Sequence, residues 1–580
     1  MLQIVSGKFF RDVELYKTQH RYVLYTNARV FNDVSTTAGG VSKANVTRDV
    51  HALVYEVEER LEAVTPSGEP EILVSTAGGS LASDFAAVLA FAWRVTCSTN
   101  IDVVRRLTRN PWSQTDSAVP AKYVQRIFDA EVVIRPDDTD HLPTFVNRLI
   151  GLERAQYREV MRAIRRYNVA LQRLGDDLPL TYLLLVASIE SLAQKFDGFQ
   201  PNWNDLDERK RKVIDGALED ADVAVSERVR SAVLEIEHVA IGRRYREFAL
   251  SRLPPSFFRS DAAQYLGPAR RRDLPEALGR AYGLRSKLVH RLGELPRILT
   301  ATPTHNDIIQ VDGRPLLTFN GLARLARTVI MTVVQEAPKV EREIFNYRRD
   351  LPNVLTVPLA PRYWVWKAEG FTAETTNAYL SGFLGELAAV LRGDSDAQLT
   401  NITDVLQRIE EIAPGISATC RLPALVLYHL FHWFVSVNWR RPAFEIFLQK
   451  HESELHAPSV ASLVGHVVSG AAVDWPVKEH DEQVERYFTT RFHKGGLHID
   501  PLFETAVLIH AAQRHLLDGS PERARDWIAQ AADHMPGHLI LTETEARMAS
   551  QRISPEDLEW QKVLLPKPDS PDGAGGNSAA

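Results

Sequence analysis

The segment Thr181–Ala193 constrains the fold more than any other, because it is apolar on nearly every side and carries a single carboxylate, Glu190. A helix without a polar face has to be covered by other helices, so this segment predicts the centre of a helical bundle. A carboxylate buried there needs a partner.

Two further patterns extend this bundle. From about Leu142 the sequence is almost wholly helical, and prolines divide it into pieces of helical length. Further on, an amphipathic stripe with Arg324 and Arg327 outside it predicts a closing helix; its apolar residues are Leu322, Leu325, Ala326, Val329, Ile330 and Val333. We therefore expect one helical bundle over residues 141–349.

The chain before the bundle mixes strand and helix signals. Short β-branched or aromatic runs predict strands at 21–25, 71–75 and 131–135. Helical patterns are expected at 48–64 and 80–108. Residues 1–140 are therefore predicted to form a small α/β domain.

The chain after the bundle is predicted to begin with a proline-rich linker at 350–365 and to end in a disordered tail at 561–580. Residues 366–560 between them are helical again. One segment there fits a tetratricopeptide repeat, through Leu508, Ala511, Ala524, Ile528, Ala531 and Pro536. The alternative is a bundle in which small residues allow close packing, and either form offers helices to a protein partner. The expected fold class is thus mainly α, with an α/β section first and a repeat-like section last.

Composition limits the classes of function. A formal net charge of −6 over 580 residues excludes a globally basic nucleic-acid coat, so any contact with nucleic acid has to be local. Cys97 and Cys420 lie far apart and provide neither a disulfide framework nor a cysteine-ligated zinc site. No stretch has the pattern of a signal peptide or a membrane helix, so we expect a cytoplasmic protein that does not contact membranes.

The segment Ala281–His290 holds the residues best suited to chemistry, since Arg285 is followed by His290 with four residues between them. A chain of this composition is expected to contain one or two such pairs by chance. The setting is more specific, because the pair lies between the Glu190 segment and the closing helix at 321–334.

This order of segments resembles the Apea-like members of the HEPN superfamily over about residues 145–345. Their Arg-x4–6-His motif is matched by Arg285 and His290, and Ser286 stands where many members carry Asn, Asp or His. The resemblance implies an endoribonuclease that needs no metal ion or cofactor, as found in bacterial toxin and phage-defence systems. It also implies a homodimer in which two copies of the motif face one cleft, with Ser286, Lys287 and Glu190 supporting the catalytic pair.

The two motif side chains suit RNA cleavage. A neutral imidazole can take the proton of a ribose 2′-hydroxyl or donate one to the leaving 5′-oxygen. A guanidinium can hold the phosphate and stabilise charge on its oxygens. The expected substrate is single-stranded RNA or tRNA, and the expected products carry a 2′,3′-cyclic phosphate and a 5′-hydroxyl.

Helix geometry leaves two arrangements of this pair open. An ideal helix separates positions 285 and 290 by about 140°, so either the helix is irregular there or a second copy completes the cleft. A structural alternative pairs Arg285 with Glu190 or with a helix C-terminus and makes His290 a half-buried histidine. The protein would then be a non-catalytic interaction or RNA-binding protein.

Basic residues outnumber acidic ones by thirteen to five between residues 241 and 300. Such a patch suits a phosphate backbone. The side chains expected to contact RNA are Arg270, Arg271, Arg272 and Arg291. The alternative interpretation is a solvated helix face or contact with the acidic part of another domain.

His429 and His432 lie three residues apart, a spacing that can hold a metal ion when carboxylates join from elsewhere. Aromatic neighbours over 428–434 favour a core helix instead. The glycine-rich segments 38–40 and 77–80 lack the spacing of a nucleotide-binding loop and are expected to be turns. No metal ion or cofactor is therefore predicted.

Overall fold

The computed structural model describes residues 1–580 except 12, 14, 45–49, 65–77, 110–118, 237–239, 352–353, 551–552 and 566–580. The chain divides into two compact units, unit 1 (Met1–Thr356) and unit 2 (Val357–Ala580). The division falls inside the segment 350–365. The strand expected at 71–75 and most of the tail expected at 561–580 lie outside the described residues.

Unit 1 begins with a five-stranded antiparallel sheet in the order β3-β4-β5-β1-β6. Its strands are β1 Leu15–Thr26, β3 Val34–Thr36, β4 Gly39–Lys43, β5 His51–Glu62 and β6 Cys97–Ser98. β1 and β5 pair along their whole length, from Leu15 opposite Glu62 to Thr26 opposite His51. The strand predicted at 21–25 is confirmed. The one predicted at 131–135 is reduced to β7 Val132–Val133, which runs parallel to β2 Ala28–Arg29.

The helix predicted at 48–64 is wrong, because this segment forms β5. Leu53, Tyr55, Val57 and Leu61 are buried at alternate positions, which is the period of a strand. The glutamates and arginine among them give the segment a helix-like composition. Pairing with β1 and burial of one face outweigh that local preference.

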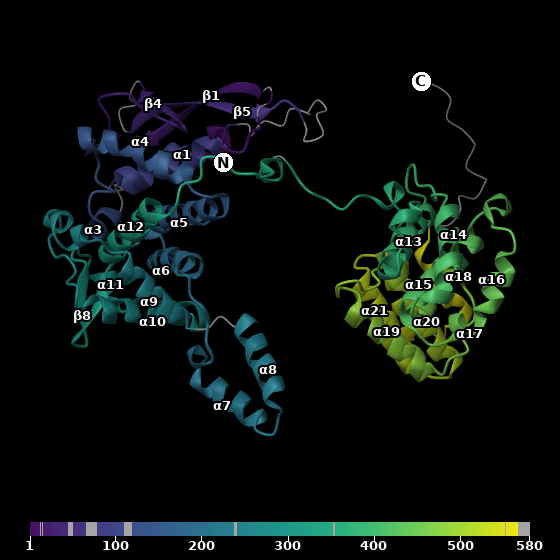
Figure 1. Ribbon diagram of the computed structural model, residues 1–580. Helices are drawn as coiled ribbons and strands as arrows, with labels where there is room; N and C mark the ends of the chain where they lie inside the picture. The colour runs from purple at the N-terminus through teal and green to yellow at the C-terminus, as the bar shows by residue number, and fades with distance from the viewer. Residues whose placement is uncertain are drawn as a thin grey trace. The chain divides into compact units, whose positions relative to one another are not determined.

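Helices cover one face of the sheet and continue away from it (Figure 1). The helices of unit 1 are α1 Gly79–Trp93, α2 Ile101–Thr108, α3 Pro120–Tyr123, α4 Pro136–Gly151, α5 Arg154–Gln172, α6 Leu178–Phe196, α7 Glu208–Ala217, α8 Val223–Ile236, α9 Ile241–Ser251, α10 Leu274–Arg291, α11 Arg297–Ala301 and α12 Phe319–Glu336. α1 contacts β1 and α5, α5 contacts α6 and α12, and α6 contacts α9 and α10. The single helical stretch expected over 80–108 is two helices with β6 between them.

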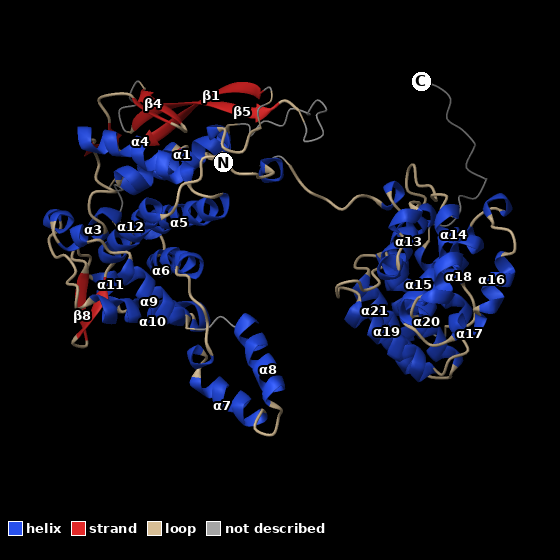
Figure 2. Cartoon of the chain, viewed as in Figure 1, coloured by secondary structure: helices blue, strands red, loops and turns tan. Residues whose placement is uncertain are grey.

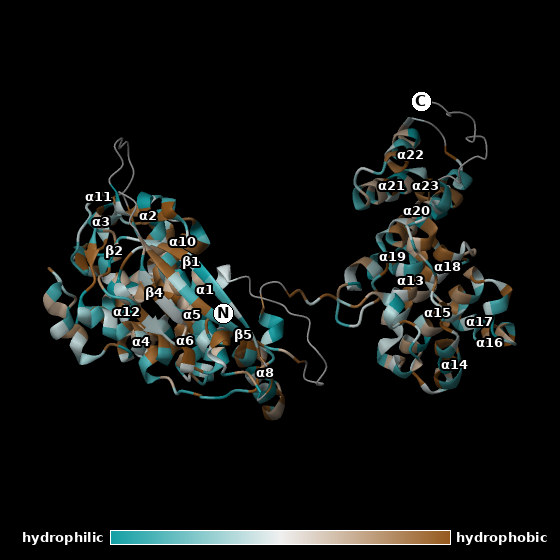
Figure 3. Ribbon diagram, turned by 90° about the horizontal axis from the view of Figure 1, so that it is seen from above, coloured by the Kyte–Doolittle hydropathy of each residue, from teal (hydrophilic) through white to brown (hydrophobic). Residues whose placement is uncertain are grey.

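A large hydrophobic core runs through unit 1, from Leu2 beside the sheet to Val334 near the end of α12. A smaller cluster joins Ile4, Phe9, Phe10 and Leu61 to Tyr347 and Leu351. The sections 1–140 and 141–349 therefore lie in one compact unit. Hydrophobic and hydrophilic residues alternate along the helices (Figure 3), as expected when one face of a helix packs against the core and the other is solvated. A β8–β9 hairpin, Ile308–Val311 and Arg314–Leu317, precedes α12.

The described secondary structure of unit 2 consists of helices joined by loops (Figure 2). Its helices are α13 Thr376–Arg392, α14 Thr403–Ile412, α15 Ala418–Phe434, α16 Phe444–Lys450, α17 Glu452–His456, α18 Val460–Ser469, α19 Val477–Thr490, α20 Pro501–Leu517, α21 Pro521–His534, α22 Leu539–Ser550 and α23 Trp560–Leu564. α20 and α21 pack together, with Ala511, Ala524 and Ala531 fully buried. This close packing of small residues fits the repeat and the bundle alike, so the tetratricopeptide arrangement stays a prediction. Across the described part of both units, no helix is long and apolar enough to cross a membrane.

Candidate functional site

The predicted motif lies on the last part of α10, which packs against α6 and α9. The helix is continuous from Leu274 to Arg291, so it has no irregularity between Arg285 and His290. Five residues of regular helix turn through about 140°, and the two side chains accordingly leave the helix on different faces. The spacing left two arrangements open, and the continuous helix excludes the first of them, an irregular helix between the two residues.

Arg285 points toward α6 and pairs with Glu190, with 2.8 Å between Nη2 and Oε2. Burial raises the pKa of the Glu190 carboxyl above its usual range, while the Arg285 guanidinium opposes that shift. Within the described part of the chain, Glu190 Oε2 and Arg285 Nε have no well-aligned hydrogen-bond partner. The pair is therefore a close ion pair without the two-pronged geometry that makes such contacts strong.

His290 is exposed, in contrast to Arg285, which is half-buried. Lys287 is also exposed and Ser286 is half-buried. Val289 and Leu292 beside the histidine are 44% and 89% exposed. The half-buried histidine of the structural alternative is therefore not observed, and an apolar surface adjoins His290.

The arginines predicted to contact RNA do not gather around the motif. Arg270, Arg271 and Arg272 are exposed just before α10, whereas Arg291 is exposed at its end. Eighteen helical residues put about 27 Å between the two groups. In one copy of the chain, the predicted basic patch is thus two separate groups of charge.

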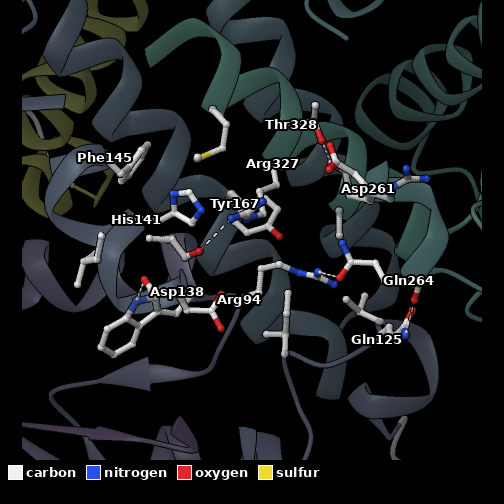
Figure 4. Close-up of a pocket in the computed structure, with 18 of the residues that line it drawn as sticks. Arg94, Gln125, Asp138, His141, Phe145, Tyr167, Asp261, Gln264, Arg327 and Thr328 are labelled. Carbon is white, nitrogen blue, oxygen red and sulfur yellow. Dashed lines mark hydrogen bonds between the residues drawn. The ribbon is translucent and has the colours of Figure 1, made fainter. Parts of the chain in front are cut away.

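A second candidate site is a cavity of about 370 Å³ in unit 1 (Figure 4). It is lined by the end of α1, the loop after α3, α4, Tyr167 of α5, α12, and the short helix η5 Ser260–Gln264 with the residue after it. Its basic side chains are Arg94, His141, Arg148, Arg324 and Arg327. Sequence patterns did not single out this site, because its residues come from distant segments.

Arg324 is one of the two arginines expected outside the apolar stripe, yet it is buried. It forms an ion pair with the buried Asp307, and it donates a hydrogen bond to the backbone oxygen of Phe257. Asp307 also accepts from the backbone N–H of Ala269 and the amide of Asn320. This network ties α12 to the loops before it, so Arg324 is a structural member of the cavity wall.

His432 of unit 2 lies in the core, as its neighbours predicted. It hydrogen-bonds to the backbone oxygen of Tyr428 at 2.7 Å and stacks on Phe444. Burial lowers the pKa of His429 to about 4. Among the described residues, no group of three or more His, Cys, Asp or Glu side chains is placed to hold a metal ion.

Comparisons of the chain with protein-family models, with curated proteins and with solved structures found no match.

Proposed function

We propose that the chain is a HEPN-type endoribonuclease that cleaves single-stranded RNA or tRNA without a metal ion. One observation carries this proposal: Arg285 forms an ion pair with Glu190, and an exposed His290 follows about one and a half turns further along α10. The exposed imidazole would move protons at the 2′-hydroxyl and the 5′-oxygen, and the partly exposed guanidinium would hold the phosphate. A toxin or phage-defence effector is the cellular role that fits such an activity.

The active form in this proposal is a pair of chains. Arg285 and His290 leave α10 on different faces, so one copy does not direct both at the same phosphate. The exposed Val289 and Leu292 give the end of α10 an apolar surface that a second copy can cover. Each cleft would then combine Arg285 of one copy with His290 of the other.

One observation favours a different function. The ion pair with Glu190 gives Arg285 a structural task, which is to fasten α10 to α6. In that case the chain is a non-catalytic interaction or RNA-binding protein, and the helices of unit 2 offer the surface for a protein partner. The two functions differ in whether His290 is required for RNA cleavage.

The decisive experiment incubates the purified full chain with labelled single-stranded RNA and with tRNA in the presence of EDTA. Wild type should give fragments that end in a 2′,3′-cyclic phosphate, and His290→Ala should give none. Because His290 is exposed, this variant should melt at the temperature of wild type. His493→Ala, at an exposed histidine of unit 2, is the matched control and should cleave normally. Equal cleavage by wild type and His290→Ala would refute the proposal that His290 is catalytic.

Mixing two inactive variants tests the shared cleft. Arg285→Ala and His290→Ala chains, combined before the assay, should regain part of the activity because mixed pairs contain one intact cleft. If each cleft used both residues of one chain, mixing would restore nothing. The same pair of proteins expressed in a bacterial host shows whether toxicity follows cleavage.

A further inference from the structure

The cavity of Figure 4 concentrates positive charge that the protein itself does not neutralise. Two arginines at its wall are neutralised by carboxylates: Arg324 pairs with Asp307, and Arg126 pairs with Asp138. Three further guanidiniums line the cavity, those of Arg94, Arg148 and Arg327. None of the three forms a salt bridge with a described carboxylate. Asp261 is the lining carboxylate without a basic partner among these residues.

The arginines still have free donors for a ligand. Arg327 gives Nε and Nη2 to the backbone oxygens of Phe91 and Ala92, at 3.0 and 2.9 Å. Arg94 gives Nη1 to the side-chain oxygen of Gln264 at 3.2 Å. A guanidinium carries five N–H groups, so most of the donors on these two side chains are not used by the described protein.

The charged guanidinium of Arg327 lies in an unfavourable environment. Burial lowers the pKa of its guanidinium, and the neighbouring Arg94 lowers it further through repulsion between like charges. The side chain is half-buried, and its protein partners are neutral carbonyl oxygens, which offset such a charge less well than a carboxylate does. An anion in the cavity would supply the missing charge.

The backbone at Arg94 gives independent support. Arg94 ends α1 in the left-handed region, with φ 57° and ψ 56°, where helices commonly place glycine. Arginine in this conformation is strained, and its side chain is nevertheless placed in the wall of the cavity. Strain at a residue that also contributes an unpaired charge is typical of a binding site.

The geometry points to a binding site for a small phosphate ester in this cavity. Three unpaired guanidiniums against one carboxylate leave an excess of two positive charges, which matches the roughly two negative charges of a phosphate monoester near neutral pH. The forked guanidinium fits phosphate oxygens, and Phe145, Tyr265 and Met331 provide surface for the organic part. The volume of about 370 Å³ is within the range of small-molecule sites.

This site is separate from the motif on α10, since none of the residues that line it lies between 285 and 290. Its ligand is a small molecule that enters a walled cavity. The phosphate site does not depend on a ribonuclease activity, because its charges, donors and strained backbone all belong to the cavity.

The test measures binding to the full chain by titration calorimetry, with adenosine 5′-monophosphate and inorganic phosphate as probes. Adenosine and acetate serve as the probes that lack phosphate. Wild type should bind both phosphate probes and should bind adenosine and acetate at least about tenfold more weakly. Equal affinity for acetate and phosphate, or no binding of either phosphate probe at millimolar concentration, would overturn the inference.

Arg94→Gly is the informative variant, because it removes the guanidinium and relieves the strained backbone together. It should melt at or above the temperature of wild type and bind phosphate probes about tenfold more weakly or worse. Asp312→Gly is the matched control, since Asp312 has φ 53° in the β8–β9 turn and does not line the cavity. Arg148→Gln should also weaken phosphate binding. Unchanged phosphate affinity in both Arg94→Gly and Arg148→Gln would contradict the assignment.

Discussion

Glu190 on α6 and Arg285 on α10 face each other with 2.8 Å between a carboxylate oxygen and a guanidinium nitrogen. The side chain of Glu190 is 7% exposed and that of Arg285 is 22% exposed, so the carboxylate is the more deeply buried partner. Removal of Arg285 therefore leaves an unpaired carboxylate that is buried, whereas removal of Glu190 leaves an unpaired cation that is partly exposed. This asymmetry can be measured.

Arg285→Ala should destabilise unit 1 more than Glu190→Gln does. The first change leaves a buried carboxylate without its ion-pair partner, and we expect it to cost about 1–3 kcal/mol at pH 7. The second leaves a cation that still reaches water, and it removes a carboxyl whose pKa burial raises. Chemical denaturation of both variants provides the comparison. A larger loss in Glu190→Gln would show that the ion pair serves mainly to neutralise Arg285.

Two glycines of unit 1 should respond to alanine in opposite ways. A Cβ at Gly321, in the first turn of α12, would collide with the backbone oxygen of Asp307. Gly321→Ala should therefore destabilise unit 1 by about 2–3 kcal/mol. A Cβ at Gly279, inside α10, meets no atom within 4 Å, and Gly279→Ala should stabilise by roughly 0.5–1 kcal/mol. Melting temperatures that move in the same direction would contradict this pairing.

Sequence patterns located the elements whose signal is local. The apolar segment Thr181–Ala193 lies within α6, and the stripe at 322–333 lies within α12. Each pattern extends over several turns and requires only that one side of a helix be covered. Of the two partners considered for Arg285, the structure has Glu190.

Sequence patterns did not reveal the features that form between segments far apart in the chain. β5 has the composition of a solvated helix and becomes a strand because β1 pairs with it along twelve residues. The cavity joins Arg94, Arg148 and Arg327, which lie on three helices or helix ends far apart in the sequence. One local signal was available, since an arginine directly follows the apolar helix at 79–93, where a glycine is common.

The buried pair of Asp307 and Arg324 should be among the most sensitive in unit 1. Asp307→Asn keeps the shape of the side chain but leaves the Arg324 cation buried without a counter-charge. We expect a loss of about 2–4 kcal/mol in the free energy of unfolding. Arg324→Met added to Asp307→Asn should recover part of it, because the unpaired charge is then gone. A double variant less stable than Asp307→Asn would show that the hydrogen bond of Arg324 to Phe257 outweighs the cost of the unpaired charge.

Unit 2 should lose stability as the pH falls from 7 to 5. Burial lowers the pKa of His429 to about 4 and that of His510 to about 3, compared with 6.5 in the unfolded chain. Between these values the unfolded chain binds more protons than the folded one, so stability is present above pH 6.5 and is lost below it. Each histidine should cost about 1–2 kcal/mol by pH 5.

His510 is the clearer of the two histidines to test. Its Nδ1 lies 2.9 Å from Nε2 of His480, and the charges of His480, Arg514 and His466 all oppose its protonation. Hydrogen exchange of the α20 amides in the full chain should speed up between pH 7 and 5, after correction for the intrinsic exchange rate. His510→Leu should reduce this pH dependence, whereas His493→Gln, at an exposed histidine, should leave it unchanged. Equal pH dependence in wild type and His510→Leu would show that protonation of His510 does not limit the stability of α20.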